Sequence, residues 1–252
     1  RYWFNHNGIL SYDPVQDVIE RHPRDPAAVA AFPEETYNES LFLEGDSNLW
    51  SGTAHTLCRF DRSTRNYHHI PYPRSQPGEA QPFLHAIHRA QDGVFWLGTS
   101  LGLMRYDRTD RSEPWAVYVN DPTDAASLST DVVYSILADP TDTDVLWVGT
   151  NGGGLNRFSK RTGQVRRYSA KDGLPNDVVY GILADDAGHL WMSTNKGLCR
   201  FDRTTGACRN YDASDGLQGD EFNRYAFCKQ PDGRMFFGGV NGFNHFDPAQ
   251  LA

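Results

Sequence analysis

A short tryptophan-containing pattern recurs along the whole chain and constrains its fold more than any other feature. The clearest copies are LWMSTNKGLCRFD at 190–202, LWSGTAHTLCRFD at 49–61, FWLGTSLGLMRYD at 95–107 and LWVGTNGGGLNRFS at 146–159. Weaker copies are MFFGGVNGFNHFD at 235–247 and YWFNHNGILSYD at 2–13. Successive anchoring aromatic residues are 44 to 51 positions apart: Trp3, Trp50, Trp96, Trp147, Trp191 and Phe236. A period of this length is the signature of a repeat protein.

Each repeat predicts four short strands. In the best copy, Asp172 to Tyr211, the runs expected to form strands are 178–183, 189–194, 198–201 and 208–211, and Gly, Asn and Asp residues separate them. Turn residues at this density are hairpin signals, so each unit is expected to be an antiparallel meander. Four strands in a period of roughly 40 to 50 residues predict an all-β chain of the β-propeller type, built of four-stranded antiparallel blades.

The six visible units differ in completeness. We expect a single β-propeller domain over 1–252, with units at about 1–21, 36–72, 82–119, 130–169, 177–211 and 221–252. The first unit lacks its first strand and the last lacks its fourth. Both contain strands two and three, so they cannot merge into one blade. The sequence is therefore interpreted as a piece of a longer chain, whose ring is expected to have seven blades.

The repeated residues are expected to have structural roles. The tryptophan faces a neighbouring blade, and Gly98 and Gly149 leave room for close packing. An aspartate follows the aromatic residue of the third strand, where its carboxylate can bind backbone amides and start a turn. These aspartates are Asp13, Asp61, Asp107, Asp202 and Asp247. The fourth unit has Ser159 there, which can do the same more weakly and which favours a structural role over catalysis.

No pattern indicates a catalytic residue, a metal site or a cofactor. The nine histidines show no recognised ligand spacing, and His85 and His88 point to opposite faces of the strand expected at 83–90. No nucleophile elbow is present. Cys199 and Cys208 lie on adjacent strands of one predicted hairpin. Since a cross-strand disulfide requires a particular Cβ geometry, a bridge between them is the less favoured alternative.

Charge and hydropathy limit the partners. The formal net charge is −8, which argues against nucleic acid because phosphate binding relies on surplus Lys and Arg. No apolar run approaches the roughly 20 residues that cross a bilayer, so no membrane contact is expected within this fragment.

The run GLPNDVVYGILADDAGHLWMST at 173–194 resembles the two-component regulator propeller repeat. SLSTDVVYSILAD at 127–139, followed by VLWVGT, is a second good copy, and 215–248 resembles the closing blade of such propellers. The resemblance implies the periplasmic or otherwise extracytoplasmic sensor region of a histidine kinase or hybrid two-component system. In that family an immunoglobulin-like domain, a membrane span and the kinase usually follow, and many members detect polysaccharide fragments. The first unit matches only partly, and the second has SGTAHTL where a Gly-Leu pair is usual.

Propellers bind ligands where loops converge on one mouth of the central channel. Turns and inter-unit loops beside Tyr37, Tyr134, Tyr180 and Tyr225 offer polar side chains that suit a small polar ligand or an oligosaccharide. Lys196 and Arg224 are the strongest candidates, because turn geometry does not require them. The full predicted set is Lys196, Arg224, Asn223, Asn195, Asn151, His55, Asn241, Asn176 and Tyr225.

Three functions remain open at this point. A ligand-binding sensor module is favoured by the family resemblance and by the lack of a catalytic constellation. An enzyme similar to propeller lyases requires a metal or a His and Glu pair at the channel mouth. A scaffold for protein contacts could act through a homodimer.

Overall fold

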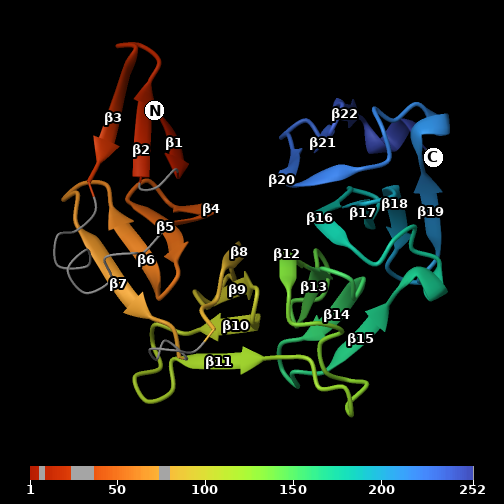
Figure 1. Ribbon diagram of the computed structural model, residues 1–252, viewed down its shortest axis with the longest axis horizontal. Helices are drawn as coiled ribbons and strands as arrows, with labels where there is room; N and C mark the ends of the chain where they lie inside the picture. The colour runs from red at the N-terminus through yellow and green to blue at the C-terminus, as the bar shows by residue number, and fades with distance from the viewer. Residues whose placement is uncertain (6–8, 24–36, 74–79, 252) are drawn as a thin grey trace. The chain divides into compact units, whose positions relative to one another are not determined.

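The computed structural model describes residues 1–5, 9–23, 37–73 and 80–251 (Figure 1). In this part of the chain all regular structure is β-strand, apart from three short 3₁₀ helices. Most of the segment between the first two expected repeat units, 22–35, and of the segment between the second and third, 73–81, lies outside the described residues. The chain also divides into two compact parts, and from here on 'first unit' and 'second unit' mean these parts, while the single repeats are called blades. The first unit is Arg1–Leu101 with Arg105–Trp115, and the second is Gly102–Met104 with Ala116–Ala252.

The first unit begins with a three-stranded sheet. Its strands are β1 (Tyr2–Asn5), β2 (Ile9–Asp13) and β3 (Val18–His22). A four-stranded sheet follows, made of β4 (Tyr37–Glu44), β5 (Asn48–Thr53), β6 (Thr56–Asp61) and β7 (Tyr67–Pro71). The next sheet has β8 (Leu84–Arg89), β9 (Phe95–Thr99), β10 (Gly102–Tyr106) and β11 (Trp115–Tyr118), and the division between the units falls within β10 and β11.

The second unit contains three further sheets. The first has β12 (Val133–Ala138), β13 (Val145–Thr150), β14 (Leu155–Ser159) and β15 (Val165–Tyr168). The second has β16 (Val179–Ala184), β17 (His189–Thr194), β18 (Gly197–Asp202) and β19 (Cys208–Tyr211). The third has β20 (Phe222–Lys229), β21 (Met235–Gly239) and β22 (Gly242–Phe246). The 3₁₀ helices η1 (Ala170–Asp172), η2 (Ala213–Asp215) and η3 (Pro248–Gln250) connect or end these sheets.

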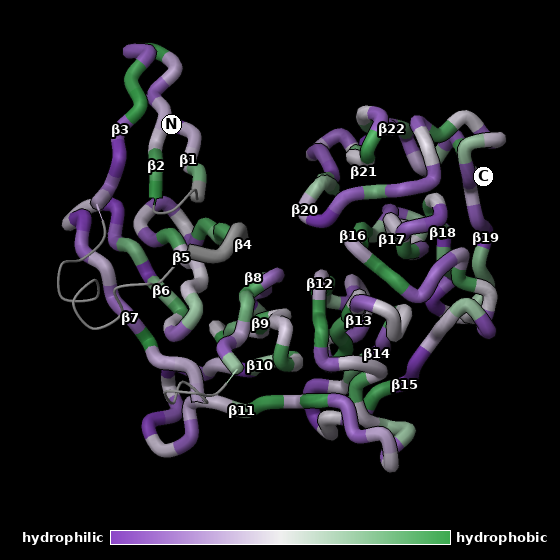
Figure 2. The backbone as a smooth tube through the Cα atoms, in the orientation of Figure 1, coloured by the Kyte–Doolittle hydropathy of each residue, from purple (hydrophilic) through white to green (hydrophobic). Residues whose placement is uncertain are grey.

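Each sheet is an antiparallel meander in chain order, which confirms the predicted fold class of β-propeller blades. In the fifth blade, Leu183 pairs with Trp191, which pairs with Arg200, which pairs with Arg209. The blade is driest in its second strand. In β17, every residue from Leu190 to Thr194 is buried, whereas the outer strand β19 has no buried residue. Figure 2 shows long apolar stretches in β12 and β16.

The tryptophans pack between neighbouring blades, as predicted. Trp50 and Trp147 are each 1% exposed. The ring centroid of Trp50 lies 4.4 Å from that of Phe95 in the next blade, and Trp147 lies 5.6 Å from Phe201. Each such ring contributes a few kcal/mol to stability by the area that it removes from water. The blades are therefore held together by the repeat residue itself.

The close approach predicted at Gly149 is confirmed. A Cβ atom there would lie 2.8 Å from Cγ1 of Val179 in the neighbouring blade and would also collide with the Ser135 hydroxyl. Contacts this short do not occur between real side chains, so only glycine allows β13 and β16 to approach this closely.

The repeated aspartates organise the turn between the third and fourth strands. Asp61 Oδ1 accepts from the backbone amides of Ser63 at 2.8 Å and Thr64 at 3.0 Å. Hydrogen bonds from Ser63 and from these amides lower the pKa of Asp61 to about 2. In the fourth blade Ser159 Oγ accepts from the Thr162 amide at 3.3 Å. The predicted turn role, weaker for serine, is confirmed at both positions.

The cysteines of the predicted hairpin, Cys199 in β18 and Cys208 in β19, are free thiols. Cys199 is fully buried and packs in the apolar layer between the fourth and fifth blades. It acts as a small core residue.

Candidate ligand-binding site

The first strands of the three blades in the second unit, β12, β16 and β20, lie side by side (Figure 1). β12 and β16 carry a tyrosine just after their first buried valine, in the sequences DVVYS and DVVYG. β20 carries Arg224 and Tyr225 near the same end. Three tyrosines and one arginine from consecutive blades are thereby brought to one region of the second unit.

The β20 segment differs from its neighbours by a local insertion. Val179 pairs with Thr194 and Ile182 with Met192, so two residues separate these paired positions in β16. In β20 the corresponding pairs are formed by Phe222 and Phe227, and four residues separate them. The two additional residues form a bulge, which pushes side chains out of the regular pleat.

The bulge contains a backbone outlier. Tyr225 has φ of 62°, in the left-handed region that bulky residues rarely adopt. Its side chain is 36% exposed, so burial of the ring does not account for this conformation. Strained residues of this kind concentrate at binding sites, where the surroundings hold them in place.

The four side chains form a partly exposed cluster, called here the tyrosine cluster: Tyr134, Tyr180, Arg224 and Tyr225. The rings of Tyr134 and Tyr180 stack, with centroids 5.7 Å apart and an interplanar angle of 28°. Arg224 Cζ lies 5.3 Å from the Tyr134 centroid and 5.8 Å from that of Tyr225. The guanidinium therefore lies over aromatic faces, where the ring quadrupole attracts a cation.

Asn195 extends this cluster from the turn between β17 and β18. The Tyr180 hydroxyl donates to Asn195 Oδ1 at 2.6 Å. Burial and the neighbouring Tyr134 raise the pKa of Tyr180, so the phenol stays protonated and can donate at neutral pH. This hydrogen bond holds the side-chain amide of Asn195 by its oxygen, and the amide nitrogen is not used in it.

The cluster combines two kinds of recognition chemistry. Exposed aromatic rings bind the apolar C–H faces of a ligand, whereas a guanidinium and an amide bind hydroxyl or anionic groups. A carbohydrate presents both kinds of surface on one ring. Arg224 supplies a positive charge in a chain whose formal net charge is −8.

The structure brings three of the predicted site residues together: Asn195, Arg224 and Tyr225 belong to the tyrosine cluster or contact it. Lys196 is exposed in the same turn as Asn195, and its amide donates to Thr194 Oγ1 at 2.9 Å. Asn223 is exposed beside Arg224 in β20. A ligand role for each of these residues stays a prediction.

The other predicted residues have turn or pairing contacts. Asn176 Oδ1 accepts from the Val178 amide at 2.8 Å, and the Asn241 amide donates to Gln218 Oε1 at 2.7 Å. Asn151 forms an isolated antiparallel bridge with Val178. His55 belongs to the first unit, where its amide approaches Thr53 Oγ1.

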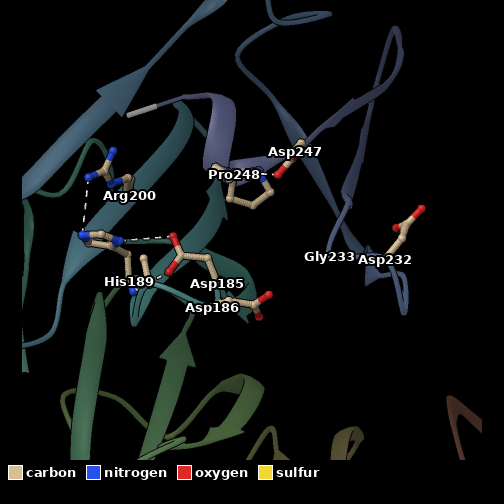
Figure 3. A pocket seen from close by; sticks show the side chains of 10 residues that line it. Asp185, Asp186, His189, Arg200, Asp232, Gly233, Asp247 and Pro248 are labelled. Carbon is tan, nitrogen blue, oxygen red and sulfur yellow. Dashed lines mark hydrogen bonds and ion pairs between the residues drawn. The ribbon is translucent and has the colours of Figure 1, made fainter.

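Sequence reasoning placed Tyr134 and Tyr180 beside the site without including them in it. The signal was available, because DVVY occurs at both 131–134 and 177–180. The tyrosine at this repeat position is half-buried in both blades, and Tyr180 also packs against the apolar layer between the fifth and sixth blades. A cavity in the second unit, lined by Asp185, His189 and Pro248 among others, was missed altogether (Figure 3).

Two further structural observations concern the described residues. They contain no group of three or more His, Cys, Asp or Glu side chains placed to hold a metal ion. No helical segment in the same part of the chain has the length and hydropathy of a membrane span.

The repeated four-stranded meanders with interblade tryptophans define the chain as a β-propeller protein. Residues 173–196 match the family model described as two component regulator propeller. The chain therefore carries a two-component regulator propeller repeat, and the resemblance predicted from 173–194 is confirmed. A comparison with curated proteins found no match.

Several solved structures are similar to this chain at low sequence identity. The extracellular domain assigned to the one component system BT4673 of B. thetaiotaomicron is 17% identical, with a TM-score of 0.44 over 99% of this chain and 39% of that chain. For the extracellular domain assigned to the hybrid two component system BT3049 of B. thetaiotaomicron, identity is 18% and TM-score 0.46 over 83% and 33%. A chain of the mitotic checkpoint complex is 11% identical, with a TM-score of 0.66 over 95% and 69%. The present chain thus spans about two fifths of the BT4673 domain.

Proposed function

We propose that this chain is the ligand-binding part of an extracytoplasmic sensor of a two-component signalling protein, and that it binds a carbohydrate or other polar effector at the tyrosine cluster. The repeat at 173–196 supports the signalling class. The observation that carries the site is Arg224 lying over Tyr134, whose ring stacks on Tyr180. Neither packing nor turn geometry requires an arginine in the β20 bulge.

The strain at Tyr225 supports the same site. A left-handed tyrosine costs on the order of 1–3 kcal/mol, which a purely structural position has no reason to retain. In the proposed complex the sugar ring lies against Tyr134 and Tyr225, while Arg224 and Asn195 bind its hydroxyl groups or a carboxylate. Lys196 and Asn223 lie next to these two polar residues in the sequence and are proposed to widen the polar side of the site.

The test begins with a thermal-shift screen of plant, algal and host glycans, because a ligand that binds only the folded state raises its melting temperature. Affinity for any glycan found is then measured by calorimetry for the wild type and for R224A and K196A. R224A is expected to weaken binding about tenfold, the loss of one charged hydrogen bond or cation–π contact.

Arg209 supplies a matched control. Its Cζ lies 5.0 Å from the Tyr211 centroid on the outer strand β19, so R209A also removes an arginine from a tyrosine face. R209A should leave the affinity unchanged. Equal affinity of wild type, R224A and K196A for a confirmed ligand contradicts the proposed site.

A further inference from the structure

Three blades carry an arginine directly after the repeated aspartate at the end of the third strand. These residues, called here the turn arginines, are Arg62, Arg108 and Arg203. Each reaches the blade that precedes its own. Arg203 Nη1 lies 2.6 Å from Asp139 Oδ1, and Arg108 Nη2 lies 3.1 Å from Glu44 Oε1. Arg62 Cζ lies 4.8 Å from the ring centroid of Trp3.

The acidic residue that receives the turn arginine also holds the repeat tryptophan. Trp147 Nε1 donates to Asp139 at 2.7 Å, and Trp50 Nε1 donates to Glu44 at 2.8 Å. The carboxylate thus binds an indole of its own blade and a guanidinium of the next blade. At Asp139, whose side chain is 6% exposed, the guanidinium is the counterion of a buried carboxylate, whereas Glu44 also pairs with Arg89 at 2.9 Å.

On its other side, the turn arginine binds the turn between the first and second strands of its own blade. Arg62 Nη1 donates to the carbonyl of Asp46 at 2.6 Å. Arg203 Nε donates to the carbonyl of Gly188. Arg203 therefore lies between a carboxylate of the preceding blade and a turn carbonyl of its own blade, and Arg108 and Arg62 each make one of these two contacts.

The sixth blade has the acceptors without the arginine. Asp247 directly follows the third strand of this blade, β22, and the next residue is Pro248. In the preceding blade Asp185 accepts from Trp191 Nε1 at 2.9 Å, as Asp139 does from Trp147. The turn between β20 and β21 contains Gly233, at the repeat position of Gly188.

A cavity of about 530 Å³ occupies the corresponding place (Figure 3). Its lining includes Asp185, the carboxylate of the preceding blade, and Gly233, from the turn between β20 and β21. It also includes Pro248, which stands where three other blades have the turn arginine. Asp186, Asp232 and Asp247 also line it, as do His189 and Arg200. All of these residues belong to the second unit.

The carboxylate of Asp185 is ready to receive a cation. Its side chain is only 7% exposed. Burial favours the neutral form, but hydrogen bonds from Trp191 and His189 prevail and lower the pKa of Asp185. Arg200 does not take the place of a turn arginine. Its guanidinium approaches Nε2 of His189 at 3.4 Å (Figure 3) and donates to the Leu251 carbonyl at 3.1 Å.

We propose that this cavity binds a guanidinium group, supplied by an arginine side chain of another polypeptide segment or by a small guanidinium compound. The ligand class follows from the chain's own repeats: Arg203 shows both contacts of this setting, Arg108 shares the carboxylate and Arg62 shares the turn carbonyl. A guanidinium fits better than an ammonium, because its planar fork reaches the carboxylate and the turn carbonyl together. The proposal is independent of the tyrosine cluster.

Calorimetry of the 252-residue chain with three probes tests the ligand class. N-acetylarginine amide represents a peptide side chain, methylguanidine represents a small compound, and N-acetyllysine amide is the control of equal charge. Saturable binding of either guanidinium probe supports the site. Binding of methylguanidine indicates that the head group suffices, whereas binding of arginine amide alone indicates a polypeptide source. Lack of binding by both, or equal binding of the lysine amide, overturns the proposal.

A substitution that restores the repeat tests the location. Pro248→Arg supplies a turn arginine from within the chain, so it should fill the cavity, weaken probe binding at least about tenfold and raise the melting temperature. Pro14→Arg is the matched control, since Pro14 follows Asp13 at the same repeat position in the first blade. It adds the same charge and should leave probe binding unchanged. Full probe binding by P248R overturns the proposal.

Asp185→Asn provides a second route if P248R does not fold. The amide keeps an oxygen for the Trp191 indole but removes the negative charge, so probe binding should fall about tenfold or more. Folding of both variants is checked by tryptophan fluorescence. Unchanged binding in a folded D185N protein also overturns the proposal.

Discussion

At the scale of single residues, charge pairs between blades differ widely in their importance. Arg203 and Asp139 are 13% and 6% exposed, and Asp139 also binds Trp147. Burial opposes ionisation of Asp139, but the hydrogen bonds from Arg203 and Trp147 hold its pKa well below the usual range. Removing the arginine leaves a buried carboxylate without its counterion, which is the costly way to break such a pair.

We therefore expect R203A to lower the free energy of unfolding by about 3 kcal/mol. Urea denaturation measures this effect. Arg157 and Asp142 form the matched control in the same unit, because their side chains are 39% and 49% exposed. R157A should change stability by no more than about 0.5 kcal/mol. Similar losses for the two variants would show that burial does not set the importance of these pairs.

Glycine 181 offers a second test at this scale. A Cβ atom on Gly181 in β16 would collide with the ring of Phe227 in the neighbouring blade. Overpacking of this kind costs roughly 1–3 kcal/mol, so G181A should lower the urea midpoint. Gly219 is the control, since its Cβ would meet only the amide nitrogen of Asn241, at 3.0 Å. That side chain can move, and G219A should be nearly neutral. An equally stable G181A protein would contradict the tight packing.

At the scale of the strands, local sequence was sufficient to predict the position of most strands. The strand expected at 178–183 is observed as Val179–Ala184, and the one at 189–194 is observed unchanged. These runs are short, apolar and bounded by turn residues, so their ends are determined locally. The bulge in β20 was not predicted, because counting its two additional residues requires the pairing of Phe222 and Phe227 with β21.

The same reason explains which part of the site was predictable. Arg224 could be selected from sequence because neither a turn nor a core needs it. Its position over Tyr134, two blades away in sequence, depends on the side-by-side placement of β12, β16 and β20. The cavity at Pro248 could not be predicted, because it lies where the sixth blade lacks a turn arginine. It becomes visible only once Arg203 is seen to reach Asp139.

The β20 bulge yields a prediction at this scale. Asn adopts the left-handed conformation of Tyr225 more readily than tyrosine does, so Y225N should keep or raise stability by up to about 1 kcal/mol. The same variant should weaken binding of a ligand at the tyrosine cluster, because it removes an aromatic face. Thermal melting and calorimetry together measure the two effects. A variant that loses stability and keeps full affinity would show that the tyrosine is structural.

At the scale of the whole molecule, the repeat makes stability depend on pH. One aspartate of the same type occurs in most blades, and its pKa is lowered by backbone or side-chain hydrogen bonds at Asp13, Asp61, Asp107 and Asp202. A carboxyl group whose pKa is lower in the folded state stabilises the fold fully above its unfolded value of 3.8, and this contribution disappears as the pH falls through the folded value. Because the aspartate recurs, its small contributions to the free energy of unfolding add up, and all of them are lost as the pH falls.

The melting temperature should accordingly fall steeply between pH about 4 and about 2, with the lower end set by Asp61, whose pKa is about 2. Differential scanning calorimetry across this range, repeated in 1 M salt, measures the decline. Salt screens repulsion between surface charges, so a decline that persists in salt belongs to the hydrogen-bonded carboxylates. The double variant D61N/D202N keeps an oxygen for each turn but cannot titrate there, and its decline should be shallower than that of the wild type. If wild type and double variant lose stability in parallel, the turn aspartates are not the groups responsible, and the acid sensitivity must originate in buried carboxylates such as Asp139 and Asp185.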